Sequence, residues 1–144
     1  MGLLRQPVVV AADRVGTILV LELGNLRVQA FDIFGNPVAY FSARTAPFLA
    51  LTQSTASSVF LDMKADAEGL LYVLSYEGDG FAPADYHLDI YDAQTGGFVC
   101  RTAGIAAARM ALDVWRNVYT LNYEYYLGPA GRPEPTVSEW IPSA

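Results

Sequence analysis

Residues 12–41 read ADRVGTILVLELGNLRVQAFDIFGNPVAYF, and this stretch decides the fold class. Apolar residues alternate with a period of two around residues 18–20 and 28–30, which is typical of half-buried strands. Gly-Asn pairs at 24–25 and 35–36 interrupt the alternation. Such pairs readily take positive φ and favour tight reversals between antiparallel strands. The stretch therefore predicts an antiparallel meander.

The start of this pattern recurs twice further along the chain. The segments ADRVGTILVL, ADAEGLLYVL and LDVWRNVYTL align on the aspartates Asp13, Asp66 and Asp113. The spacing is 53 residues from 13 to 66 and 47 residues from 66 to 113. Four-stranded units repeated every 40 to 50 residues or so are the sequence signature of β-propeller blades. We therefore expect an all-β chain of propeller-type blades.

The repeats predict the individual strands of a single domain spanning residues 1–144. Strands are expected at 8–12, 17–23, 27–32, 37–42, 59–65, 70–76, 87–92, 97–102, 109–114, 117–123 and 136–141. They form blades at roughly 8–42, 59–102 and 109–141, of which two have four antiparallel strands and the third has three. Helix is expected at most as a turn in 45–55 or 106–109. Residues predicted to be buried between sheets are Val20, Val28, Phe31, Val73, Ile90, Tyr91, Val118 and Trp140.

The first repeat resembles the NHL-repeat β-propeller family. The residues that carry the resemblance are Gly16, Val20, Gly24, Asn25, Arg27, Val28, Gln29, Phe31, Asp32 and Gly35. The second repeat keeps part of this pattern, and the third keeps less, with Arg116-Asn117 where the turn glycine is expected. The resemblance implies a propeller fold and a role as an interaction platform. Because propellers need about four to eight blades to close, we expect an incomplete ring.

Composition excludes several classes of protein. The 144 residues are 53% hydrophobic and 17% charged, which argues against disorder. The net charge of −6 and scattered basic residues argue against nucleic acid as a partner. We see neither an apolar run of the ~20 residues that span a bilayer nor a signal peptide, so no membrane partner is expected and localisation stays open. The single cysteine, Cys100, cannot form an internal disulfide and is predicted to be a small buried residue.

Three long connections are the candidate binding loops. They cover residues 43–57, 76–86 and 123–135, and they should emerge on one side of the blades because turns alternate between the two ends of a meander. Long loops on a rigid scaffold often carry binding residues. The candidate partner- or ligand-binding residues are Tyr76, Glu77, Asp79, Phe81, Tyr86, Tyr123, Tyr125, Tyr126 and Arg132. Their aromatic rings suit an interface or a carbohydrate platform, or alternatively pack on their own loops.

The residue types give little support for catalysis. The acidic run at 77–85 does not have the spacing of a regular calcium loop. His87 is the chain's single histidine, so this chain alone cannot supply a zinc site of two or three histidines. The repeated aspartates and Arg27 are interpreted as structural blade residues, the aspartates as acceptors for turn N–H groups. We expect no catalytic residue, no metal and no cofactor.

The leading functional hypothesis is a non-catalytic protein-binding or scaffold module. An array with open ends leaves apolar faces and strand edges that favour association. Three explanations for the small number of blades stay open: a piece of a longer propeller, a homodimer that closes a six-bladed ring, or a subunit of a larger assembly. The alternative functions are part of a propeller enzyme, such as a metal-dependent lyase or hydrolase, and a glycan-binding module that uses the aromatic loops.

Overall fold

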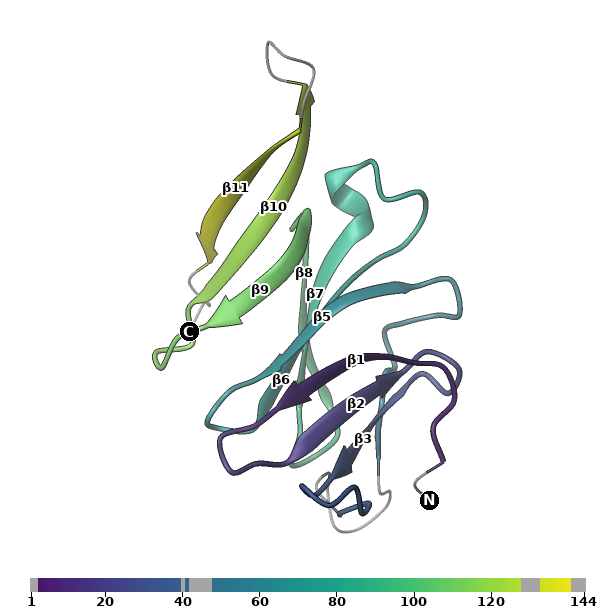
Figure 1. Cartoon of the computed structure of the whole chain (residues 1–144). Helices are drawn as coiled ribbons and strands as arrows, with labels where there is room; N and C mark the ends of the chain where they lie inside the picture. The colour runs from purple at the N-terminus through teal and green to yellow at the C-terminus, as the bar shows by residue number, and fades with distance from the viewer. Residues whose placement is uncertain (1–2, 40, 42–47, 128–132, 141–144) are drawn as a thin grey trace.

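The protein is an all-β chain of three antiparallel sheets (Figure 1). The computed structural model describes residues 3–39, 41, 48–127 and 133–140, with side chains described up to Leu121. The first sheet has the order β1-β2-β3-β4, the second β5-β6-β7-β8, and the third β11-β10-β9. The strand bounds are β1 Pro7–Ala12, β2 Ile18–Glu22, β3 Arg27–Phe31, β4 Phe48–Ala50, β5 Val59–Ala65, β6 Leu70–Tyr76, β7 Tyr86–Asp92, β8 Phe98–Ala103, β9 Ala107–Leu112, β10 Val118–Leu127 and β11 Pro133–Trp140.

Helical structure among the described residues is confined to one 3-10 turn, Pro83–Asp85. It precedes β7 and does not coincide with either turn predicted from the sequence, because residues 107–109 belong to strand β9. Within the described part of the chain, no helix has the length and apolar character needed to cross a membrane.

The repeated aspartates shape the first turn of each sheet, as predicted. Asp13 Oδ1 accepts hydrogen bonds from the backbone N–H groups of Val15 and Thr17 at 2.9 and 2.8 Å. Asp66 and Asp113 make the same pair of bonds, all at 2.9 Å, two and four residues further on. Carboxylates that accept local N–H groups stabilise such turns. The aspartates are therefore structural, and this explains their recurrence.

The third turn departs from the other two at its glycine position. Gly16 and Gly69 have φ of 88° and 87°, and Arg116 takes φ of 67° at the corresponding place. A non-glycine residue in this region carries a steric cost. The Arg116 guanidinium also contacts the Glu68 carboxylate at 3.0 Å, which joins the third turn to the second.

One predicted strand of the first sheet is wrong. Residues 37–42 form no strand in their described part: Pro37 makes only an isolated bridge with Phe31, and residues 40 and 42 lie outside the described set. The fourth strand is instead β4, whose Leu49 pairs with Val28. Proline lacks an N–H for a strand ladder, and Phe41 is buried in the core without extending the sheet.

The core consists of two layers, one on each face of the second sheet. One layer joins the first and second sheets and includes Leu19, Leu21, Met63, Leu71 and Val73. The other joins the second and third sheets and includes Tyr72, Leu74, Leu88, Met110 and Val118. Alternation along β6 sends successive side chains into opposite layers. The second sheet is thus sandwiched between the other two.

Most of the residues predicted to be buried are buried. Val28, Phe31, Val73, Tyr91 and Val118 are enclosed. Val20 and Ile90 are only partly buried, and the side chain of Trp140 lies outside the described residues. Val20 points away from the second sheet, where no other sheet of the described chain covers it. Its exposure is a direct consequence of the open end of the stack.

The first strands of the sheets lie side by side. β1 packs beside β5, and β5 packs beside β9. Figure 1 shows the purple, teal and green-to-yellow sheets following one another in chain order, with the β5–β8 sheet in the middle. The described residues form an open succession of three sheets.

Candidate functional site

The loop between β6 and β7 is fastened to itself. The rings of Tyr76 and Tyr86 lie with centroids 5.2 Å apart, and the Tyr86 hydroxyl donates to the Gly80 carbonyl at 2.9 Å. Gly80 has φ of 75°, and a Cβ there would lie 2.9 Å from Tyr76 Cε2. Tyr76 and Tyr86 therefore support the loop, in line with the second of the two interpretations drawn from the sequence.

The other candidates in this loop differ in what they offer a partner. Glu77 accepts a hydrogen bond from the Ser58 hydroxyl at 2.9 Å, which ties the loop to the connection before β5. Asp79 accepts from the N–H of Phe81 at 3.0 Å. The Phe81 side chain is 68% exposed, so it is the large apolar contact surface at the tip of this loop.

The predicted third loop is largely a hairpin. β10 runs to Leu127, so Tyr123, Tyr125 and Tyr126 lie on a strand, and Tyr123 pairs with Pro135 in β11. Tyrosine has a high strand propensity, which favours extension of the hairpin over an irregular loop. The side chains of these tyrosines and all of Arg132 lie outside what the structure describes. The prediction of a loop at 123–135 is therefore wrong for its strand residues.

The first predicted loop, 43–57, contacts the second sheet through its described part. The Gln53 carbonyl accepts from Arg101 Nη2 at 2.8 Å, and the Gln53 N–H donates to the Tyr91 hydroxyl at 3.3 Å. Arg101 also pairs with the buried Asp89 at 2.7 Å, and hydrogen bonding to this carboxylate raises the pKa of Arg101. The Ser58–Glu77 bond separately joins the predicted loop at 76–86 to the residue that follows the first predicted loop.

The described residues contain no group of three metal-ligating side chains. His87 is half-buried on β7, and its Nδ1 atom is buried without a hydrogen-bond partner. Cys100 is exposed on β8, so the prediction that it is buried is wrong. β8 is the outer strand of the second sheet, and all six of its residues are exposed. A cysteine on such a strand has no core to enter.

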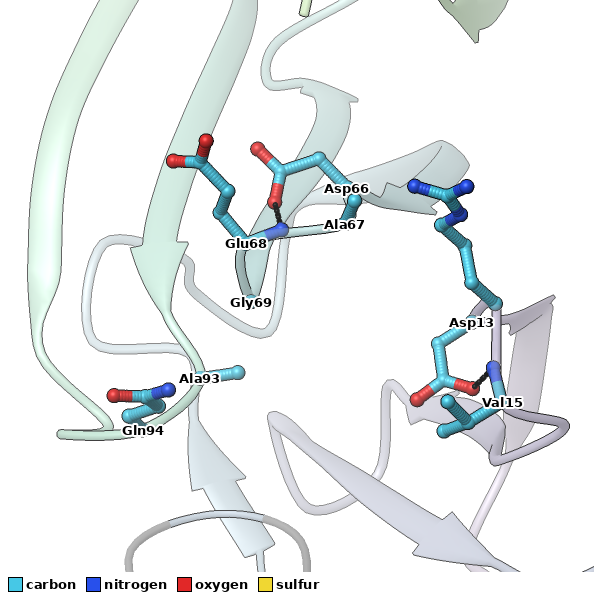
Figure 2. Close-up of a pocket in the computed structure, with 9 residues that line it drawn as sticks. Asp13, Val15, Asp66, Ala67, Glu68, Gly69, Ala93 and Gln94 are labelled. Carbon is cyan, nitrogen blue, oxygen red and sulfur yellow. Dashed lines mark hydrogen bonds between the residues drawn. The ribbon is translucent and has the colours of Figure 1, made fainter. Parts of the chain in front are cut away.

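A hollow of about 570 Å³ lies between the first turns of the first and second sheets. Figure 2 shows Asp66 and Glu68 on one side of it and Asp13 and Val15 on the other. Both aspartates accept N–H groups of their own turns, so their carboxylates serve the backbone. The hollow thus results from the separation of neighbouring turns and contains no paired acid and base set apart for chemistry.

The outward surface of the first sheet is apolar along β1 and the start of β2. Towards β3 the same surface carries Glu22, Arg27 and Gln29, which bond to residues 3–5 of the N-terminal segment. We call it the leading face and define it by Val8, Val10, Ile18 and Val20. Val10 is 63% exposed and Val8 is 48% exposed, while Ile18 and Val20 are partly exposed. Val10 pairs with Val20 across β1 and β2, and a hollow of about 270 Å³ lies against them. The leading face is an apolar sheet surface open to solvent.

The outward surface of the third sheet is the second such surface. We call it the trailing face and define it by Arg109, Ala111, Tyr119 and Leu121. Tyr119 pairs with Ala111, and Leu121 pairs with Arg109. Leu121 is 37% exposed, and a hollow of about 240 Å³ lies against this surface. The two end sheets therefore each present an apolar face away from the middle sheet.

The repeat shows what these positions do elsewhere in the chain. Alignment on the three aspartates places Val10, Ile18 and Val20 of the leading face at the positions of Met63, Leu71 and Val73, which are at most 1% exposed. It places Tyr119 and Leu121 of the trailing face at the positions of Tyr72 and Leu74, also at most 1% exposed. The exposed faces thus consist of residues at sheet-contact positions. The sequence repeat contains this signal, whereas the candidate binding residues predicted from the sequence lie in the three long connections.

Comparison with known proteins assigns no family to this chain. No family model and no curated protein matches the sequence. One similar structure is a protein of unknown function from Bacteroides caccae, with 13% identity and a TM-score of 0.49 over 90% of this chain and 44% of that one. Another is a "putative oxidoreductase (glucose dehydrogenase)" from Thermus thermophilus, with 15% identity and a TM-score of 0.44 over 84% of this chain and 38% of that one. The chain spans less than half the length of either protein.

Proposed function

We propose that this chain is a non-catalytic protein-binding and scaffold module built from NHL-like propeller blades. It binds protein through the leading and trailing faces of its sheet stack. Support for the blade assignment comes from the repeated four-stranded pattern, from the shared aspartate turns and from the adjacent first strands β1, β5 and β9.

The single observation that carries the proposal is the exposure of Val10. It occupies the repeat position at which Met63 is 0% and Met110 is 5% exposed, yet Val10 is 63% exposed. Contiguous apolar surface in water is costly at about 25 cal/mol per Å², and large exposed patches mark interaction sites. A surface that repeats the composition of two internal contacts is best explained as a third contact with its partner removed.

The alternatives have weaker support. A metal-dependent propeller enzyme would need several histidines from parts of a larger protein, since this chain contributes His87 alone. A glycan platform would use open aromatic faces. In the predicted loop at 76–86 Phe81 is exposed, whereas the Tyr76 and Tyr86 rings contact each other and support their own loop.

Cysteine accessibility in cell extract tests the proposal. In a Cys100→Ser background, Val10→Cys and Ala111→Cys are labelled with a maleimide, and Val15→Cys on the exposed first turn is the control. We expect the control to react quickly and the two face cysteines to be protected at least tenfold in extract of the source cells. Face cysteines that react as fast as the control, both in extract and after purification, would refute a binding role for these faces.

A further inference from the structure

We infer that the partner of the leading face is the trailing face of a second copy of this chain. This inference rests on the proposed function and specifies its partner. Two contacts between sheets lie within the chain, one between the first and second sheets and one between the second and third. In each of them a sheet places one face on the next sheet in chain order.

The trailing face reproduces the face that the second sheet places on the third. Tyr119 and Leu121 repeat the Tyr-x-Leu pattern of Tyr72 and Leu74. The Tyr119 hydroxyl donates to Asp113 Oδ2 at 3.1 Å, as the Tyr72 hydroxyl donates to Asp66 Oδ2 at 3.2 Å. The same bond holds both rings in the same position relative to their turns. The trailing face is therefore oriented as a sheet-contact surface before any partner arrives.

The leading face reproduces the opposite half of the same contact. In the second sheet, Met63, Leu71 and Val73 pack against Leu19 and Leu21 of the first sheet. In the third sheet, Met110 and Val118 pack against Tyr72 and Leu74. Val10, Ile18 and Val20 occupy these receiving positions in the first sheet. The first and third sheets thus present two unlike halves of one repeated interface, and a second copy supplies the missing half to each of them.

Both faces are hollowed, with about 270 Å³ open on the leading face and about 240 Å³ on the trailing face. Unlike surfaces that meet head to tail form a ring when the rotation closes. Two copies then present six sheets, which falls within the roughly four to eight blades of known propellers.

The N-terminal segment is not available to complete a neighbouring sheet. The Arg5 N–H donates to Glu22 at 2.7 Å, and the Leu3 carbonyl accepts from Arg27 and Gln29 of its own chain. β1 also pairs with its own β2. Contact between copies therefore takes place through faces of sheets and does not require exchange of this segment.

Two blocked variants test the pairing. Val10→Asp places a charge on the leading face, and Leu121→Asp places one on the trailing face. Ala111→Asp replaces Leu121→Asp if the latter loses its β-sheet circular dichroism. The matched controls are Val15→Asp and Val114→Asp, because these two turn residues are 86% and 72% exposed.

Sedimentation velocity at equal protein concentrations measures the outcome. We expect the wild type and both controls at about twice the chain mass, and each blocked variant alone at the chain mass. Mixing Val10→Asp with Leu121→Asp leaves one free face of each kind and should restore a 1:1 dimer through that single contact, with the second contact open. A dimer formed by either blocked variant alone, or a mixture that stays monomeric while the wild type dimerises, would overturn the head-to-tail pairing.

A wild type that is monomeric throughout would also overturn this inference. If the cysteines introduced at Val10 and Ala111 are nevertheless protected in cell extract, another protein or further sheets of a longer chain cover the two faces. The proposed binding function then survives. If they are unprotected there too, the proposed function fails with the inference.

Discussion

Replacement of Glu22 by alanine should strongly destabilise the first sheet. Glu22 is 0% exposed, and its carboxylate accepts hydrogen bonds from the Arg5 N–H at 2.7 Å, Asn25 Nδ2 at 2.9 Å, Arg27 Nε at 2.7 Å and Gln29 Nε2 at 2.7 Å. The variant removes the acceptor for all four donors. Gln29 is 1% exposed, so its amide would be left buried with fewer partners.

The magnitude follows from the burial of the partners. Loss of one member of a buried ion pair costs about 3–5 kcal/mol, because the remaining charge is left without compensation. The Arg27 side chain is 21% exposed, so water can replace part of the lost interaction. We therefore expect the free energy of unfolding to fall by about 3 kcal/mol, at the low end of that range. Glu22→Gln keeps one acceptor oxygen and should cost about 2 kcal/mol, within the range for lost charged hydrogen bonds.

Urea unfolding followed by circular dichroism measures this effect. With a slope of about 2 kcal/mol per molar urea, a loss of 3 kcal/mol lowers the midpoint by about 1.5 M. Glu68→Ala is the control, because Glu68 is 67% exposed in its pair with Arg116 and such surface pairs contribute about 0–1 kcal/mol. A loss below about 1 kcal/mol for Glu22→Ala at unchanged slope would refute the role assigned to this buried network.

Individual side chains give three further predictions. Burial opposes ionisation of Glu22, but the hydrogen bonds from Arg27 and Gln29 outweigh burial and lower its pKa. The free energy of unfolding should therefore fall as the pH drops below about 4.5, because the unfolded chain binds the proton first. A pH series of urea midpoints should show a smaller fall for Glu22→Gln than for the wild type, and equal falls would contradict this. Burial and the Asp66 carboxylate raise the pKa of Tyr72 to about 12. The contribution of the neutral Tyr72 hydroxyl to stability is therefore complete below pH 10 and declines between pH 10 and 12. Absorbance titration of the wild type against Tyr72→Phe tests this, and a Tyr72 that ionises near pH 10 would refute it. Cys100 is exposed and should react with a thiol reagent in the folded protein as fast as in urea; strong protection in the monomeric chain would contradict the position of β8.

The local features of the fold were predictable because each depends on residues close in sequence. The turns at Asp13, Asp66 and Asp113 depend on bonds from each aspartate to N–H groups two and four residues later, and such local bonds can be predicted from the sequence. Alternation likewise placed most strands within one or two residues. The prediction of a strand at 37–42 was wrong because the apolar run after Pro37 has the composition of a strand. In the structure β4 pairs with β3 in its place.

The features that were not predictable depend on contacts between distant residues. Arg27 was expected to be structural, but its partner Glu22 and the covering segment at Leu3 become evident only when β2 and β3 pair. The prediction for Cys100 was wrong because it followed the usual burial of free cysteine, whereas all six residues of the outer strand β8 are exposed. The sequence predicts a binding surface in loops, where aromatic residues are concentrated, whereas the exposed contact positions lie on the strands of the end sheets.

The association state of the unmodified chain tests the central claim most directly. Sedimentation equilibrium of the purified protein from about 0.1 to 50 µM covers the concentrations at which interfaces of about −6 to −9.5 kcal/mol dissociate. The account predicts a single species near twice the chain mass of 15.6 kDa at the upper concentrations. A homogeneous, well-folded species at 15.6 kDa over the whole range would contradict the claim that the leading and trailing faces bind each other.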